Sequence, residues 1–491
     1  MKPRTKPMYG QLSPMTEDRV TGAADPAARI AFILERQKAG WLSDPLPSRE
    51  VRLDRLDRLD RMVVAWQERF CAAISADFGQ RPLLLTTLTD VVPTRAAIRH
   101  ARRHLKRWMA RRRVSLGWTG KPASAEILRQ PLGVVGIVAP WNYPLNLVLS
   151  PLTGALAAGN RAMLKPSELT PAFSEALQQA VAEFFAEDEV AVVTGGPEVA
   201  QAFTAAPFDH LIFTGSTAVG RKVAEAAARN LTPVTLELGG KSPAILDPSA
   251  DIARAVPRLV WGKLLNAGQT CVAPDYALVP RERVDAFIAA VMAEVARQYP
   301  GLPDNPDYTS IISARHFERL ERLVEEARDK GATVVELAGA NDAVRRMFAP
   351  VLLTGAPDDA AVMREEIFGP ILPVIAYDTL EEAIAYINQR DRPLALYWFG
   401  TDRAAETRVL EGTIAGGVTV NDTILHLSQD DLPFGGVGAS GHGAYHGEAG
   451  FLALSKEKPV LRQSTWSGVK LLYPPYGGVT RLMLKLLGRL G

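Results

Sequence analysis

The chain of 491 residues contains only two cysteines, Cys71 and Cys271, which stand far apart in the sequence. Two cysteines are too few for a disulfide framework, and such scarcity is typical of proteins from a reducing compartment. We therefore expect a cytoplasmic protein in which a free thiol is available for chemistry.

The sequence also lacks a long apolar run and an excess of charge of one sign. A membrane-spanning helix needs about 20 predominantly apolar residues, and no such run occurs. Residues 1–30 mix Lys, Arg, Pro and Gly without the apolar stretch of a secretory signal. The 56 Lys and Arg nearly balance the 54 Asp and Glu, so no overall field attracts nucleic acid. We expect no transmembrane segment, no nucleic-acid partner and a small-molecule substrate.

The composition that is present, 47% hydrophobic and 22% charged residues, is typical of a folded globular protein, and the length predicts two large lobes that share a cleft. Residues 26–113 carry helical periodicity. Within this segment, the basic residues of the arginine-rich stretch 95–113 alternate with the apolar residues Ile98, Leu105 and Trp108. This spacing predicts one half-buried helix with a solvated basic face and not a nucleic-acid footprint.

Beyond Gly133 the pattern changes to short apolar runs that alternate with amphipathic helices, which predicts parallel α/β sheets. The first set of strands is predicted at 133–140, 161–166, 189–196, 210–216 and 233–240. A second α/β region, 241–432, has predicted strands at 244–247, 276–280, 333–337 and 371–377. Ligands of such sheets bind beyond the carboxyl ends of the strands, and those ends carry Asn142, Lys165, Ser216 and Glu237.

Two residues are candidates for covalent catalysis. Cys271 lies in NAGQTCVAPDY, a loop-like stretch in which backbone N–H groups and a nearby base can activate a thiolate; a buried inert cysteine is the alternative. Glu237 ends an apolar run before Gly-Gly in TLELGGKSP. A carboxylate that faces the cleft there would have its pKa raised by partial burial, as suits a general base; an ordinary strand-end glutamate in water is the alternative.

The segment FTGSTAVG, residues 213–220, follows a predicted strand and opens a helix. Free backbone N–H groups and the positive helix end would therefore meet a pyrophosphate. Gly215, Ser216 and Gly220 are the candidate cofactor-binding residues of this segment, and Gly215 lets the backbone approach the phosphates.

Two other glycine patterns are interpreted as unrelated to nucleotide binding. GGKS lacks the first glycine of a phosphate loop, because Thr235 stands in its place, so Lys241 is not a phosphate-loop lysine. A GxGxxG match at Gly436, Gly438 and Gly441 has no preceding strand of useful length and no βαβ unit. We predict a flexible turn there.

Six motifs, PWNYP, LKPSE, FTGSTAVG, LELGGKSP, GQTC and EEIFGP, stand in the same order as in the aldehyde dehydrogenase superfamily, which the chain resembles from about residue 30 to 465. CVAPDY and LPFGGVGASGHGAYHG resemble the class 3 and coniferyl aldehyde dehydrogenase branch. The resemblance implies an α/β fold with a Rossmann-like cofactor lobe, an α/β catalytic lobe and a small β oligomerisation extension.

The resemblance also implies a mechanism. Cys271 attacks the aldehyde, and the Asn142 side chain with the Cys271 backbone N–H forms an oxyanion hole for the thiohemiacetal. Loss of hydride to NAD leaves a thioester, which water activated by Glu237 hydrolyses. The acid is the product, and no metal ligand set is implied.

For the cofactor, the resemblance assigns three groups of contacts. Lys165 and Glu168 would meet the adenine-side ribose, Ser216 and Trp141 the pyrophosphate, and Glu366 and Phe368 the nicotinamide ribose. A carboxylate at Glu168 would repel a 2′-phosphate and so favours NAD, although relatives of the class 3 type use NADP as well.

The expected domains follow from the same resemblance. Residues 1–113 and 130–239 would bind NAD(P), 240–432 would form the catalytic domain, and 114–129 with 456–470 the extension of a homodimer. The pattern of residues 478–491 predicts an amphipathic helix with Arg481, Lys485 and Arg489 on its basic face. It would lie on a membrane surface as a peripheral contact or cover the partner's substrate entrance, and we favour packing within the dimer.

The sequence leaves the aldehyde open between aromatic, coniferyl-type and medium- or long-chain aliphatic substrates. Three other functions would each use only part of this pattern. Acyl transfer to coenzyme A makes no use of the water-activating Glu237, and a cofactor-free cysteine hydrolase leaves FTGSTAVG and EEIFGP unexplained. A membrane-tethered scaffold without catalysis has only the C-terminal helix in its favour.

Overall fold

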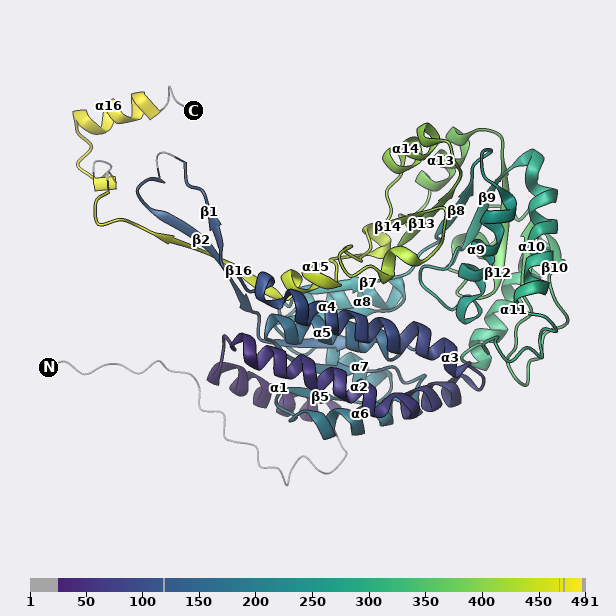
Figure 1. The fold of residues 1–491 in the computed structure, drawn as a ribbon, viewed down its shortest axis with the longest axis horizontal. Coiled ribbons are helices and arrows are strands. Elements are labelled where there is room, and N and C mark those ends of the chain that lie inside the picture. Colours follow the sequence, from purple (N-terminus) through teal and green to yellow (C-terminus); the bar gives the residue numbers. More distant parts are fainter. Residues whose placement is uncertain (1–24, 118–119, 468, 471–472, 488–491) are drawn as a thin grey trace.

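The computed structural model describes residues 25–117, 120–467, 469–470 and 473–487. Two lobes lie side by side, and an arm projects from one of them (Figure 1). The predicted absence of a secretory signal falls mostly on residues 1–24, which lie outside the described residues, as do Arg489 and the rest of 488–491.

The predicted helical lead-in is confirmed. It consists of α1 (Pro26–Ser43), α2 (Arg49–Phe78), α3 (Leu83–Thr86), the π-helical turn η2 (Thr87–Val91) and α4 (Val92–Trp108). On α4, Ile98, Leu105 and Trp108 are buried as predicted. Arg95 and Arg102 on the outer face pair with Asp60 and Asp57 of α2. The arginines thus form a solvated face that ties two helices together.

The first lobe is built on a six-stranded sheet with the order β15-β7-β6-β3-β4-β5. Its strands are β3 (Val134–Val138), β4 (Arg161–Lys165), β5 (Val190–Val192), β6 (His210–Thr214), β7 (Val234–Glu237) and β15 (Gly441–His442). Its helices are α5 (Asn146–Ala158), α6 (Pro171–Phe184), α7 (Pro197–Thr204) and α8 (Thr217–Ala228). Strands β3 to β7 run parallel, so their carboxyl ends share one edge.

Alternate side chains of these strands enter two separate cores, as the period of a strand requires. Val135 and Ile137 of β3 pack with α2, α4, α5 and α6, whereas Val134 and Val138 pack with α1, α7 and α8. Helices therefore cover both faces of the sheet, which is the arrangement of a doubly wound cofactor lobe.

The GxGxxG segment is more than a turn. After the short helix η7 (Gly438–Ser440), strand β15 pairs antiparallel with β7, and Gly441 lies opposite Glu237. Gly441 has a φ of 124°, and a Cβ there would clash with the Leu236 carbonyl. The segment therefore adds an edge strand to β7, which carries Glu237, and the prediction of a flexible turn did not include this strand.

The second lobe contains a seven-stranded sheet with the order β10-β11-β12-β9-β8-β13-β14, parallel except for the edge strand β10. Its strands are β8 (Pro243–Leu246), β9 (Tyr276–Pro280), β10 (Thr333–Glu336), β11 (Val351–Thr354), β12 (Ile371–Tyr377), β13 (Ala395–Phe399) and β14 (Gly417–Val420). Its helices are α9 (Ile252–Leu264), α10 (Val284–Gln298), α11 (Ala314–Asp329), α12 (Ala361–Arg364), α13 (Leu380–Asn388) and α14 (Arg403–Gly412), with short turns η4 (Leu265–Gly268), η5 (Arg281–Arg283) and η6 (Leu425–Ser428). All four predicted strands are present, and β11, β13 and β14 were not predicted.

The arm is a three-stranded antiparallel sheet of β1 (Arg112–Val114), β2 (Ser124–Pro131) and β16 (Ser455–Arg462). Helix α15 (Gly447–Ala453) precedes β16 in the chain, and α16 (Gly478–Leu487) lies at the far end of the arm (Figure 1). The strands overlap both segments predicted for the extension, while the domain boundaries stay predictions. Among the described residues, no helix has the length and apolar character that crossing a membrane requires.

Candidate active site

A cleft of about 840 Å³ is lined by residues of both lobes. It brings together most of the predicted site residues: Trp141, Asn142, Gly215, Ser216, Glu237, Cys271, Glu366 and Phe368. Lys165, Glu168 and Gly220 are described by the structure but do not line this cleft. The candidate nucleophile, base and oxyanion donor thus share one cavity, although they lie up to 129 residues apart, from Asn142 to Cys271.

Cys271 is carried by a sharply reversed loop after α9. Asn266, Ala267 and Gly268 all have positive φ angles, of 54°, 53° and 75°. Gln269 secures the reversal, because its Nε2 donates to the Asn266 and Ser310 carbonyls at 3.0 and 3.1 Å. The loop holds Cys271 half-buried in the cleft.

The Cys271 thiol does not ionise readily. Burial raises its pKa to about 12, and the Glu366 and Glu237 carboxylates act in the same direction. The backbone N–H groups of Cys271 and Val272 oppose this rise. The resting residue is therefore a thiol, and the thiolate expected from the loop composition forms only when a base removes the proton.

Glu237 occupies the last position of β7 and is almost completely buried. Neither carboxylate oxygen has a hydrogen-bond partner among the described residues. Burial raises the pKa of this carboxyl well above its usual value. A carboxylate in such surroundings is a stronger base than one in water, as the sequence predicted, although its burial is nearly complete and not partial.

Asn142 follows β3, and its side-chain Nδ2 donates to the Gln269 carbonyl at 3.1 Å, two residues before Cys271. A side-chain amide has two hydrogens, so one N–H remains for another acceptor. The neighbouring Tyr143 hydroxyl bonds to Thr270 Oγ1. The Asn142 loop and the cysteine loop are thereby fixed to each other.

The segment predicted to bind phosphate has the predicted strand–turn–helix form, from β6 to α8. Ser216 caps α8 by accepting a hydrogen bond from the Val219 N–H at 3.4 Å, and the Gly215 N–H donates to the Glu237 carbonyl at 3.0 Å. Gly220 lies against Leu238, where a Cβ would clash. Gly220 therefore brings α8 close to the end of β7 and does not face the cleft.

Glu366 and Phe368 form the opposite wall. Burial raises the pKa of Glu366 to about 8, and Asp275 adds to the effect. Its Oε1 has no partner in the described part of the chain. An unpartnered carboxylate oxygen in a cleft is suited to accept hydrogen bonds from ribose hydroxyls. The Phe368 ring packs edge-on against the Trp141 ring, with 5.3 Å between the ring centres.

Lys165 and Glu168 lie at the carboxyl end of β4, beside β3. Lys165 Nζ donates to the Pro166 carbonyl at 2.9 Å and pairs with Glu168 Oε2 at 3.3 Å. Burial lowers the pKa of Lys165, while Glu168 raises it. The pair lies at the same sheet edge as the cleft, where only a ligand that extends past the cleft would reach it.

Sequence reasoning missed several residues of the cleft. His316 packs edge-on against Trp141 at 5.2 Å, and Arg319 donates to the Glu366 carbonyl at 3.3 Å. Both belong to α11, whose sequence carries no motif, so only the periodicity of the helix signals them. Lys241 pairs with Asp275 and donates to the Val362 carbonyl at 2.7 Å. This structural use agrees with its exclusion as a phosphate-loop lysine.

Comparison with known proteins identifies the family. The model of the aldehyde dehydrogenase family matches residues 1–460. The chain therefore belongs to the aldehyde dehydrogenase family, and it is an NAD(P)-dependent oxidoreductase that converts an aldehyde to the acid.

The similar proteins agree with the class 3 and coniferyl branch. A probable coniferyl aldehyde dehydrogenase of Pseudomonas aeruginosa is 50% identical, over 94% of this chain and 97% of the relative. Aldehyde dehydrogenase family 3 member A2 of Rattus norvegicus is 41% identical, over 86% of this chain and 87% of the relative. The solved structure of Staphylococcus aureus AldH in a substrate-bound state has a TM-score of 0.89 and 39% identity, over 93% and 99%. The predicted fold class and branch are confirmed.

Proposed function

We propose that this aldehyde dehydrogenase works through a thioester on Cys271, with Glu237 as the base, and that it acts on aldehydes with a large apolar body, aromatic or long-chain. The observation that carries the mechanism is the placement of a buried, unpartnered carboxylate and a thiol in one cleft. A coenzyme A acyltransferase would make no use of such a base.

The chain's own residues account for the proton transfers. As Sγ of Cys271 forms its bond to the carbonyl carbon, Glu237 takes the thiol proton. The remaining Asn142 Nδ2 hydrogen and the Cys271 backbone N–H stabilise the oxyanion. A nicotinamide held in the cleft would accept the hydride that leaves the adduct carbon, so that a thioester would remain on Cys271. Glu237 releases the thiol proton to solvent and then removes a proton from the water that attacks the thioester. When the carbon–sulfur bond breaks, Sγ of Cys271 takes this proton and the acid is released.

The cofactor fits the residues that are present. The capped first turn of α8 offers backbone N–H groups for a pyrophosphate beside Ser216 and Trp141. Glu366 offers its free oxygen to the nicotinamide ribose, with Phe368 next to it. Lys165 and Glu168 would hold the adenine-side ribose, and the Glu168 carboxylate favours NAD over NADP.

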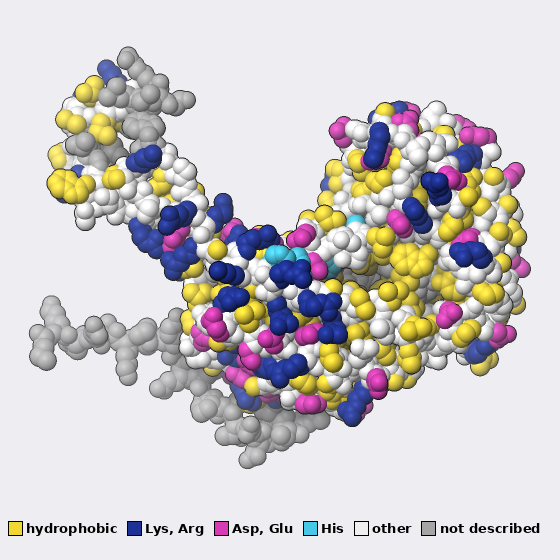
Figure 2. Space-filling view, in the orientation of Figure 1, with side chains coloured by type: hydrophobic (Ala, Val, Ile, Leu, Met, Phe, Trp, Pro, Cys, Tyr) yellow, Lys and Arg dark blue, Asp and Glu magenta, His cyan; other side chains and the backbone are white. Residues whose placement is uncertain are grey.

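A second hollow supports an apolar substrate. It measures about 660 Å³ and includes Leu265, the first residue of the turn that leads to Cys271. Its apolar lining residues include Leu84, Leu85, Leu88, Trp261, Tyr299 and Leu425, and Arg258, Arg297, Asp307 and Asp422 also line it. Figure 2 shows hydrophobic side chains along the junction between the lobes. A coniferyl-type aldehyde suits such walls, as does a long aliphatic chain, and the name of the Pseudomonas aeruginosa relative favours the aromatic class.

The test is cofactor reduction by purified protein with NAD and then NADP, using coniferaldehyde, benzaldehyde, hexanal and a long-chain aldehyde. We expect reduction with NAD, a higher kcat/KM for coniferaldehyde or the long-chain aldehyde than for hexanal, and no reduction by Cys271→Ala. Full activity of folded Cys271→Ala would overturn the mechanism. A preference for hexanal would overturn the substrate class.

The assembly and location complete the proposal. A homodimer is supported by the arm, whose strand β16 pairs with β2 on one side only among the described residues. Helix α16 exposes Val479, Leu482 and Leu484 near Arg481 and Lys485, and we place it against the partner subunit, with lipid contact as the alternative outcome of a binding test. A cytoplasmic location is supported by the need for a free Cys271 thiol.

A further inference from the structure

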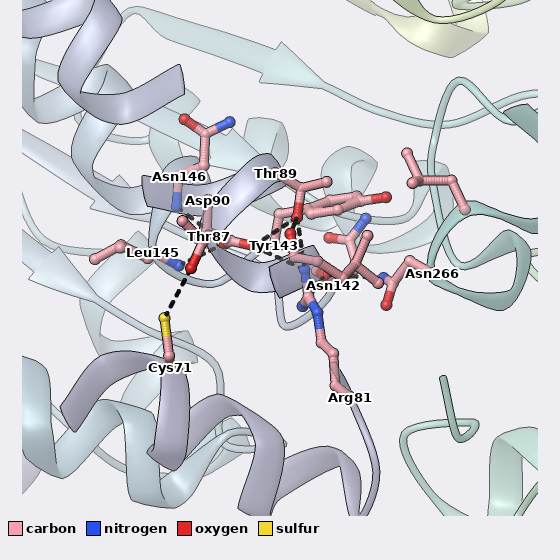
Figure 3. A network of polar contacts seen from close by, with 12 residues as sticks. Cys71, Arg81, Thr87, Thr89, Asp90, Asn142, Tyr143, Leu145, Asn146 and Asn266 are labelled. Carbon is pink, nitrogen blue, oxygen red and sulfur yellow. Dashed lines mark hydrogen bonds and ion pairs between the residues drawn. The ribbon is translucent and has the colours of Figure 1, made fainter. Parts of the chain in front are cut away.

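A buried polar network behind the cleft converges on the backbone carbonyl of Asn142 (Figure 3). Arg81 Nη1 donates to this oxygen at 2.9 Å, and Asn266 Nδ2 donates to it at 3.0 Å. We call these two donors the carbonyl clamp. They come from different parts of the chain, because Arg81 follows α2 in the first lobe and Asn266 belongs to the cysteine loop.

The charge of Arg81 is balanced inside the protein. Asp90 Oδ2 accepts from Arg81 Nη2 at 2.7 Å, and both side chains are fully buried. Asp90 Oδ1 accepts from the backbone N–H groups of Leu145 and Asn146 at 3.2 and 3.3 Å. A buried guanidinium without such a partner would be strongly destabilising. Asp90 thus links the clamp to the first turn of α5, which directly follows the Asn142 loop.

Local structure explains how these groups meet. The π-helical turn η2 contains Asp90, and the Thr89 hydroxyl within it also accepts from Arg81 Nη2, at 3.1 Å. Single π-helical turns within helices are frequent at functional sites. The guanidinium lies 5.0 Å from the Phe78 ring centre and 5.2 Å from that of Tyr143. Arg81 is therefore held by charge, hydrogen bonds and two aromatic rings.

We propose that Arg81 is a positioning residue for catalysis, which acts through Asn142. By clamping the Asn142 carbonyl together with Asn266, it fixes the backbone from which the Nδ2 donor projects toward the Cys271 loop. The inference rests on the proposed role of Asn142 in binding the oxyanion. Oxyanion stabilisation depends on donors that are already in place, and a displacement of about 1 Å can lower a rate by about 100-fold.

Arg52 provides a matched control, because it is also buried and also donates to backbone carbonyls, those of Ala157 and Ala158 at 3.2 and 2.7 Å. These carbonyls lie at the other end of α5, away from the cleft. Replacement of either arginine by lysine keeps a cation and disturbs packing to a comparable degree. Only Arg81→Lys should change the chemistry.

The experiment measures cofactor reduction in a single turnover at saturating NAD, with benzaldehyde and with benzaldehyde deuterated at the aldehyde carbon. For Arg81→Lys we expect a rate about 10- to 100-fold lower, with a deuterium isotope effect and an unchanged Kd for NAD. Arg52→Lys should stay within about 3-fold of the unmodified enzyme. Arg81→Lys combined with Asn142→Ala should be no slower than Asn142→Ala alone, because both act through one donor.

The inference is overturned if folded Arg81→Lys reacts as fast as Arg52→Lys, or if its effect multiplies with that of Asn142→Ala. A fast Asn142→Ala enzyme would instead remove the proposed oxyanion role, and the inference with it. If Arg81→Lys does not fold, Asn266→Ala removes the other clamp donor and leaves the ion pair intact. A several-fold slower reaction of that variant supports the clamp, and an unchanged rate refutes it.

Discussion

At the scale of single residues, burial sets the properties of the two proposed catalytic groups. Glu237 and Cys271 both hold their protons more tightly than in water, because the cleft offers few partners for their charged forms. A thiol whose pKa is raised to about 12 is a poor nucleophile at neutral pH unless a nearby base takes its proton. A base whose own pKa is raised can do so only above that pKa.

The raised pKa of Glu237 determines the expected pH dependence of kcat/KM for the aldehyde at saturating NAD. Because the pKa of Glu237 is raised, the active carboxylate is lost as the pH falls, so the rate should rise with pH while Glu237 is protonated and level off once Glu237 is ionised. In Glu237→Gln only solvent can deprotonate the thiol, so the lower rate should keep rising to pH 10. Initial rates across the pH range measure both curves.

A profile for the unmodified enzyme that levels off in the ordinary range of a glutamate carboxyl would contradict the raised pKa of Glu237. Identical profiles for the two proteins would show that another group is the base.

At the scale of elements, the short strand β15 beside Glu237 was not predicted from the sequence. Gly441→Ala should force a Cβ against the Leu236 carbonyl at a φ of 124°, and so detach β15 from β7. We expect a cost on the order of 2 kcal/mol, seen as a lower Tm, and a kcat/KM at least about tenfold lower because Glu237 loses its flanking strand. Thermal unfolding and steady-state rates measure these effects.

Gly196→Ala serves as the control for this substitution. A Cβ at Gly196 meets nothing within 4 Å, and its backbone has no left-handed φ. The change should stay within about 0.5 kcal/mol. Equal behaviour of the two variants would contradict the assigned role of β15.

The sequence predicts those elements and residues that a periodic pattern or a motif encodes. Apolar runs such as 133–140 and 371–377 predicted buried strands, and ordered motifs pointed to Cys271, Glu237 and Asn142, which the fold brings into one cleft. The pattern could not reveal Arg81 and Asp90, because charged residues in a sequence are normally expected at the surface. Only the fold shows that these two pair in the interior. β15 was missed because two residues carry no periodicity, and its pairing partner lies some 200 residues earlier.

At the scale of the whole molecule, the arm is the element that two subunits would share. Leu461 on β16 is 59% exposed, although it is apolar and belongs to a strand. If the arm packs against a second copy, Leu461→Asp should bury a charge in that interface and shift the mass in solution from twice 53.3 kDa toward 53.3 kDa. Light scattering on the size-exclusion peak measures the change.

Lys456→Asp is the matched control, since Lys456 is exposed on the same strand but already charged, so it should leave the mass nearly unchanged. A single-copy mass for the unmodified protein would contradict the proposed dimer.

The central claim, that aldehyde oxidation passes through a Cys271 thioester hydrolysed with the help of Glu237, is tested most directly by intact-protein mass spectrometry of Glu237→Gln. Because the thiol is deprotonated slowly without Glu237, the variant is incubated with NAD and benzaldehyde until cofactor reduction stops, and it is then quenched in acid. We predict one equivalent of reduced cofactor and a mass increase of one acyl group, which peptide mapping assigns to Cys271 and which Cys271→Ala abolishes. Rapid multiple turnover with no adduct on Cys271 would contradict the account.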